Sequence, residues 1–167
     1  IHPGETVALV GATGAGKTSF VNLISRMYDV TKGSLRIDGQ DLREVQQRTI
    51  VQSMGVALQD PFLFSSTVKE NILFGRPGAT EDQVKQAAKT VGAHGFIMKL
   101  PYGYETLLEE RGGNLSIGQR QLVSFARAVL ADPMILILDE ATANVDTLAE
   151  AAIQRALRVL LQGRTSI

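Results

Sequence analysis

The feature that most constrains this chain is the loop sequence G-A-T-G-A-G-K-T at Gly11–Thr18. It satisfies G-x-x-x-x-G-K-[ST] at every fixed position, a pattern whose glycines let backbone N–H groups close on phosphates. Lys17 is predicted to reach the β- and γ-phosphates and Thr18 to ligate Mg²⁺. A merely tight glycine-rich turn is disfavoured, because a β-branched run precedes the loop and a helical pattern follows it. The predicted nucleotide contacts are Gly11, Ala12, Thr13, Gly14, Ala15, Gly16, Lys17, Thr18 and Ser19.

A second helix start suited to phosphate is predicted where L-S-I-G-Q at Leu115–Gln119 meets a segment with apolar residues at helical spacing. A helix start carries unpaired N–H groups and the positive end of the peptide dipoles, which favour anions. One chain therefore holds two helix starts of this kind.

Composition narrows the class of protein. With 167 residues and 44% hydrophobic content, the chain can bury a core and favours one domain. The chain has 17 basic residues (Lys and Arg) and 17 acidic residues (Asp and Glu), so it lacks the excess of positive charge that is typical of a nucleic-acid binder. The absence of cysteine removes disulfides, thiolate catalysis and cysteine-based zinc sites. The sequence at both ends suggests an excerpt from a longer protein.

Hydrophobic periodicity predicts an α/β core with a helical insertion. The core comprises residues 1–60 and 131–167, and the helical subdomain residues 61–130. Strands are expected at Thr6–Val10, Ser34–Ile37, Met54–Leu58 and Met134–Leu138. Helices are expected after the phosphate loop as far as Met27, from a capping box at Thr80 to about Val91, after Leu115, and at Leu148–Leu161.

Polar residues follow two of these strands. Asp139 and Glu140 come directly after I-L-I-L, and ligands of open α/β sheets bind at the carboxyl edge. Asp139 is predicted to hold Mg²⁺ through water, and Glu140 to polarise the attacking water as a general base. The amide of Gln59 could meet both the metal and this water. Alternatively, Asp139 and Glu140 could only cap a helix or lie in a solvated turn. Gln59 could likewise be an ordinary turn residue.

Other candidate residues carry weaker signals. His2 and His94 have no second histidine or cysteine at metal-ligand spacing, so both are predicted to be structural or solvent-facing. Phe62, Leu63 and Phe64 follow Pro61 in a predicted loop. They could belong to the core or mark a docking surface.

Taken together, these motifs resemble the nucleotide-binding domain of ATP-binding cassette (ABC) transporters over essentially the whole chain. The resemblance implies a P-loop NTPase (RecA-like) core with ATP and Mg²⁺. L-Q-D-P around Gln59 is similar to the Q-loop, and I-L-I-L-D-E to the Walker B strand with its catalytic glutamate. The signature motif would be Leu115, Ser116, Ile117, Gly118 and Gln119, which in this family cap ATP held by a partner's Walker A loop. Spacing alone leaves open a fold back onto the chain's own ATP.

Finer motifs resemble the exporter subclass. Two segments are similar to that subclass: D-P-F-L-F-S-S-T-V-K-E-N-I, which starts at Asp60, and T-L-L-E-E-R-G at Thr106–Gly112. The second resembles the family's X-loop, and this resemblance implies that Glu110 contacts the membrane domains. Phe62 and Phe64 are assigned to the same coupling surface. Glu109 stands where a glycine is usual, and A-N-V-D ending in Asp146 departs from the usual D-loop but keeps its acid.

The resemblance implies an ATPase that powers transmembrane export by head-to-tail dimerisation, at the cytoplasmic face of the cell membrane. Its partners would be a second nucleotide-binding domain, as a homodimer or heterodimer, and the transmembrane domains. Two alternatives are a soluble non-transport ABC ATPase of DNA repair or translation, and a nucleotide-binding module with little activity by itself. The family's adenine-stacking aromatic residue and switch histidine would fall outside Ile1–Ile167.

Overall fold

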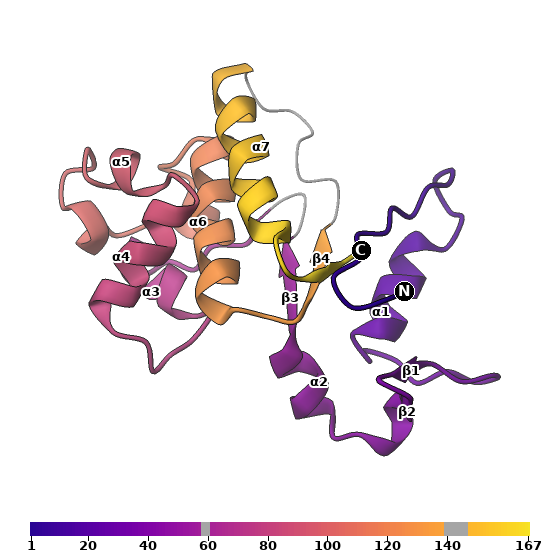
Figure 1. The fold of residues 1–167 in the computed structure, drawn as a ribbon. Coiled ribbons are helices and arrows are strands. Elements are labelled where there is room, and N and C mark those ends of the chain that lie inside the picture. Colours follow the sequence, from indigo (N-terminus) through magenta and orange to yellow (C-terminus); the bar gives the residue numbers. More distant parts are fainter. Residues whose placement is uncertain (58–60, 139–146) are drawn as a thin grey trace.

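A computed structural model describes residues 1–57, 61–138 and 147–167 of the chain (Figure 1). The helices and strands, in chain order, are α1 (Lys17–Ile24), β1 (Arg36–Ile37), β2 (Gln40–Asp41), η1 (Leu42–Glu44), α2 (Gln47–Ser53), β3 (Met54–Ala57), α3 (Val68–Leu73), α4 (Glu81–Thr90), α5 (His94–Ile97), η2 (Gly103–Glu105), η3 (Glu110–Gly112), α6 (Ile117–Ala131), β4 (Ile135–Leu138), α7 (Thr147–Leu161) and β5 (Thr165–Ser166). The predicted α/β class and the helical content of residues 61–130 are confirmed.

The central sheet has the order β3-β4-β5, and both of its pairings are parallel. The strand predicted at Met134–Leu138 is confirmed as β4 from Ile135 onward. The strand predicted at Met54–Leu58 is confirmed as β3 as far as Ala57, and Leu58 lies outside the described residues. The strand predicted at Thr6–Val10 is wrong beyond its first residue, because only Thr6 forms a parallel bridge, to Ser166. The neighbouring strand β5 has only two residues to pair with, and Val10 is 94% exposed.

Local sequence signals place the other elements. Asp38 and Gly39 both adopt positive φ, at 50° and 79°, and join β1 to β2 as the short turn that their sequence predicts. The capping box at Thr80 is present, and its helix ends before Gly92 with φ 77°. α1 ends one turn before Met27, which is exposed.

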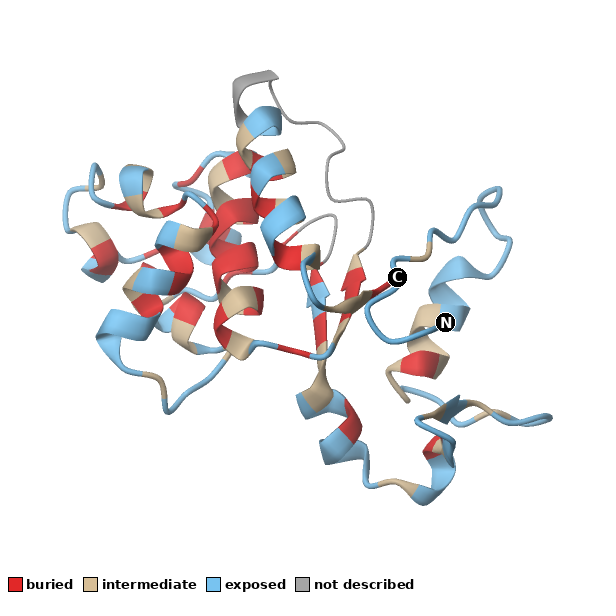
Figure 2. Ribbon diagram, viewed as in Figure 1, coloured by how far each residue is buried: buried red, intermediate tan, exposed pale blue. Residues whose placement is uncertain are grey.

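The core lies in the helical part of the molecule. Figure 2 shows buried residues concentrated on α3, α4, α6, α7 and the sheet, whereas the segment around α1 is mostly exposed. α6 packs against α3, α4, α7 and β3, and nine of its fifteen residues are buried. Among the described residues, no helix has the length and apolar character to cross a membrane.

The end of α3 lies directly against the backbone of α6. A Cβ built on Gly75 would lie 2.2 Å from the Arg127 carbonyl oxygen and 3.3 Å from the Ala131 nitrogen. Both neighbours are backbone atoms of a buried helix, so neither can move aside cheaply. The absence of a side chain at Gly75 therefore permits this close approach.

We expect Gly75→Ala to lower the free energy of unfolding by about 1–3 kcal/mol, because the added methyl group overpacks this contact. Gly78→Ala is the matched control, since a Cβ at Gly78 meets no atom within 4 Å. Thermal and urea unfolding of the two variants measure the difference. Equal stability of the two variants would contradict the close approach.

Candidate functional site

The phosphate loop is an exposed backbone arch that leads into α1. Gly14 and Gly16 adopt φ of 84° and 94°, a left-handed conformation that glycine reaches without strain. The Ala15 amide donates to the Ala12 carbonyl at 3.1 Å, and the Lys17 Nζ donates to the carbonyls of Gly11 at 2.6 Å and Ala12 at 3.1 Å. The lysine ammonium is therefore held over the loop.

The start of α1 has no side-chain cap. Its N-cap residue is Gly16, which offers no acceptor to the first-turn amides. These amides, including those of Lys17, Thr18 and Ser19, have no intrahelical partner by the geometry of a helix start. Together with the Lys17 ammonium, they form a donor set that suits the phosphates of a nucleotide, and the Thr18 hydroxyl is available to a bound Mg²⁺.

The start of α6 is built differently, because its own side chains cap it. The Gln119 amide donates to Ser116 Oγ at 3.3 Å, and the Ser116 amide donates to Gln119 Oε1 at 3.0 Å. Ser116 is exposed, whereas Leu115 and Gly118 are buried. The capping box orders the helix start without a ligand, and Ser116 Oγ, which accepts this hydrogen bond, still carries its own hydrogen as a donor.

The predicted catalytic and metal residues Gln59, Asp139 and Glu140, and the D-loop residue Asp146, lie outside the described residues. The strands that precede them are described. Parallel register pairs Ala57 with Leu138, so β3 and β4 end side by side. Of the predicted Mg²⁺ ligands, Thr18 alone belongs to the described part of the chain.

The segment after Pro61 divides between core and surface. Leu63 is buried at 1% exposure, whereas Phe62 and Phe64 are 50% and 37% exposed. Leu63 therefore belongs to the core, whereas the two phenylalanines lie on the surface, and the docking role stays a prediction. Phe64 also contacts Phe74, which is 60% exposed, with ring centroids 4.7 Å apart, and Phe62 meets Phe64 edge-on at 5.1 Å. We call Phe62, Phe64 and Phe74 the aromatic patch.

Residues 106–112, the predicted X-loop, lie beside this segment. The Leu108 amide donates to the Ser66 carbonyl at 2.9 Å, and the Val68 amide donates to the Thr106 carbonyl at 3.0 Å. Glu110 is exposed at the start of η3. Glu109 adopts φ −69° and ψ 173°, an extended conformation open to any residue, so this departure from the family's glycine does not strain the loop.

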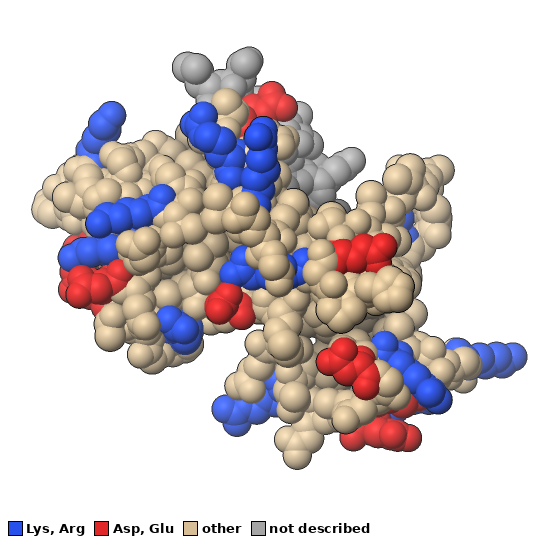
Figure 3. All heavy atoms as spheres, viewed as in Figure 1, with Lys and Arg blue, Asp and Glu red and all other residues tan. Residues whose placement is uncertain are grey.

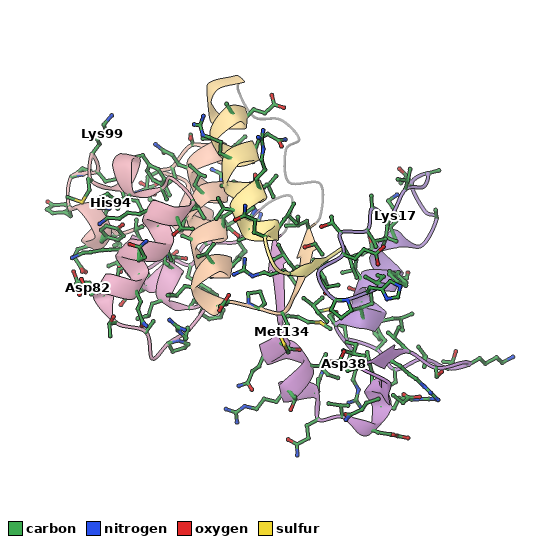
Figure 4. The ribbon with its side chains drawn as sticks, in the orientation of Figure 1. Lys17, Asp38, Asp82, His94, Lys99 and Met134 are labelled. Atoms are coloured by element: carbon green, nitrogen blue, oxygen red, sulfur yellow. The ribbon has the colours of Figure 1, made fainter. Side chains whose placement is uncertain are left out.

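These features lie in different parts of the molecule. Figure 1 shows α1 and α6 on opposite sides of β3 and β4, and Figure 4 shows Lys17 far from the helical part that carries His94 and Asp82. Within one chain, the uncapped start of α1 and the capped start of α6 therefore do not lie next to each other (Figure 1). His94 has a structural contact, because its Nδ1 lies 2.9 Å from the Tyr104 hydroxyl.

Comparison with known proteins identifies the family. A family model described as "ABC transporter" matches residues 1–143. The chain belongs to the ABC transporter family. Membership supports nucleotide binding and ATPase chemistry in general, in agreement with the α1 start.

Individual relatives agree with this assignment. The chain is 53% identical over 167 residues to an uncharacterized ABC transporter ATP-binding protein of Bacillus subtilis strain 168, covering all of the chain and 28% of the relative. It is 52% identical to a Staphylococcus aureus (strain NCTC 8325) protein named "Putative multidrug export ATP-binding/permease protein", covering all of the chain and 29% of that protein. The solved structure of a bacterial Atm1-family ABC exporter with ATP bound matches with a TM-score of 0.90 and 42% identity, over 99% of this chain and 29% of that one. The chain thus spans less than a third of the length of these ABC proteins.

Sequence reasoning missed Phe74 of the aromatic patch and Arg127, which contacts the patch. Phe74 directly follows α3, a helix that was not predicted, although T-V-K-E at Thr67–Glu70 has the spacing of the capping box that starts it. Arg127 interrupts the apolar face of α6, and its guanidinium carbon lies 5.6 Å from the Phe64 ring centroid and 5.5 Å from that of Phe74. An arginine inside the otherwise apolar run F-A-R-A-V-L-A at residues 125–131 was the available signal.

We expect Lys17→Ala to raise the dissociation constant for Mg-ATP by about 10- to 100-fold, because it removes a charged donor worth roughly 1.5–3 kcal/mol. Lys32→Ala, at an exposed lysine outside the loop, is the matched control. Titration calorimetry measures both constants. Unchanged affinity in Lys17→Ala would contradict the assignment of the phosphate loop.

Proposed function

We propose that this chain is the ATP-binding and ATP-hydrolysing domain of an exporter, and that it powers transport by closing head to tail on a second nucleotide-binding domain. The observation that carries this proposal is the pair of unlike helix starts. The start of α1 is uncapped beside a lysine ammonium, and the start of α6 is preformed on the opposite side of the sheet. This separation supports a role for α6 at the nucleotide of a partner.

The roles of the residues follow from their chemistry. The backbone amides of residues 11–19 and Lys17 bind the phosphates. Thr18 and Gln59 would hold Mg²⁺ directly and Asp139 through water, and the ion would neutralise developing charge. Glu140 accepts the proton of the attacking water. Leu115–Gln119 contribute Ser116 and Gly118 to the partner's ATP, and Asp146 lies on the D-loop. A single copy is expected to hydrolyse ATP slowly, because its own α6 does not complete its site.

The aromatic patch and the X-loop form the proposed contact with the transmembrane domains. Phe62 and Phe64 are exposed, and backbone hydrogen bonds join their segment to the loop that carries Glu110. Exposed aromatic clusters of this kind mark interaction sites. The relatives have more than two thirds of their length outside the matched segment, and one is named as a permease, which supports membrane domains as the occupant.

We propose that the domain works at the cytoplasmic face of the cell membrane, as part of a membrane transporter. The soluble alternative of DNA repair is less well supported, because acidic and basic side chains are interspersed over the face shown in Figure 3 and the totals of the two are equal. The named relatives favour export as well.

We expect Glu140→Gln in the full-length protein to lower kcat for ATP hydrolysis by about 100-fold or more while ATP binding persists, because the amide cannot accept a proton. ATP should then hold two domains together, which light scattering detects. Glu44→Gln, at an exposed position in η1, controls for the loss of one charge. Normal turnover in Glu140→Gln would overturn the role of Glu140.

The partner role of α6 can be tested by complementation. Asp is as good an N-cap as Ser, so Ser116→Asp should keep the helix start while its charge repels the γ-phosphate. A Lys17→Ala chain co-expressed with a Ser116→Asp chain has one intact site if α6 acts on the partner, and none if it acts on its own chain.

We expect mixed pairs, purified through a different tag on each chain, to recover about half of the normal hydrolysis rate, whereas each variant paired with itself stays inactive. Ser116→Asn, a neutral cap of equal quality, should lose less activity than Ser116→Asp. Mixed pairs as inactive as the single variants would refute the partner role.

A further inference from the structure

Arg127 has three hydrogen bonds that neither the phosphate site nor the X-loop explains. It lies on α6 about three turns after Ser116. Its Nε donates to the Asn71 carbonyl at 2.8 Å, Nη1 to the Phe62 carbonyl at 3.0 Å, and Nη2 to Asn71 Oδ1 at 3.1 Å. Each guanidinium nitrogen therefore bonds to the segments that carry the aromatic patch.

The same guanidinium packs on the patch itself. It lies within 6 Å of the ring centroids of Phe64 and Phe74, the range of a cation–π interaction. Burial lowers the pKa of Arg127 below its ordinary value, as expected of a cation that has lost part of its water. The rings and the acceptors replace that lost hydration.

Asn71 completes the connection. Its side chain is fully buried, accepts from the Phe64 amide at 2.8 Å and donates to the Phe64 carbonyl at 3.0 Å. Arg127 thus holds Asn71, and Asn71 holds the backbone of Phe64. On the other side of the patch, Gly75 leaves no space between the end of α3 and the Arg127 carbonyl. Hydrogen bonds and ring contacts therefore link all three aromatic residues of the patch to Arg127 on α6.

We propose that Arg127 is a positioning residue that fixes the aromatic patch to α6, so that the patch moves with the helix start that carries Ser116. A 15-residue helix buried along its length transmits displacement from one end to the other as a unit. The planar fork is required, because three acceptors in fixed directions suit guanidinium, whereas the ammonium of lysine is a point charge. The mechanical role rests on the proposed function, but the fixation itself does not.

Hydrogen exchange in the nucleotide-free, full-length protein tests the fixation. In both Arg127→Lys and Arg127→Met, amides of residues 62–75 should exchange about tenfold faster or more, because charge-assisted hydrogen bonds are lost. Amides of α4 should be unchanged. Arg76→Met, at an exposed arginine next to Gly75, is the matched control and should alter neither segment. Unchanged exchange at residues 62–75, or equal acceleration in α4, would overturn the proposal.

A second arm adds ATP to the Glu140→Gln protein with and without Arg127→Lys. With Arg127 present, exchange should slow at residues 115–119 and change at residues 62–75 together. With lysine, the response at residues 115–119 should persist while that at residues 62–75 is lost, which a general loss of stability would not produce. A patch that still responds in Arg127→Lys would refute the coupling. No response at residues 115–119 in either protein would count against the proposed partner role of α6, and the nucleotide-free arm would still decide the fixation.

Discussion

The burial of α6 is the constraint on which the rest of the structure depends. Phe125 and Ala126 are fully buried, and the helix packs against α3, α4, α7 and β3. Small residues such as Ser124 and Ala128 allow these neighbours to approach closely. Because so many elements pack on one helix, its first turn and its Arg127 are held in fixed relation. The helix can therefore present its capped start, the proposed phosphate contact, and support an aromatic surface at the same time.

The two helix starts satisfy the same backbone requirement by different means. At α6, Ser116 and Gln119 bond to each other's backbone amides, so the start is ordered before any ligand arrives. At α1, Gly16 supplies no side chain, and the first-turn amides remain for an anion. The difference follows from residue type alone. Ser116 and Gln119 order the start of α6 without a ligand, whereas Gly16 leaves the first amides of α1 open to an anion.

Sequence patterns predicted those features that depend on neighbouring residues. The capping box at Thr80, the helix start after Leu115, the Asp38-Gly39 turn, and the buried strands β3 and β4 all follow from local chemistry. The strand expected at Thr6–Val10 failed because pairing depends on a partner elsewhere in the chain, and β5 is short. The contacts of Arg127 with residues 62–74 join segments more than fifty positions apart, which no local pattern contains. The roles of Gln59, Asp139, Glu140 and Asp146 stay predictions from sequence.

The distribution of burial divides the proposed composite site into an adaptable half and a fixed half. Residues 11–19 are all exposed and contribute nothing to the hydrophobic core, so this loop can adjust to a nucleotide at little cost in packing. A ligand that binds it stabilises the exposed part of the chain by linkage. The partner's α6 start, in contrast, is held by the core and cannot adjust separately. In the proposed closure, α6 would move as a body, and the elements packed on it, including the aromatic patch, would move with it.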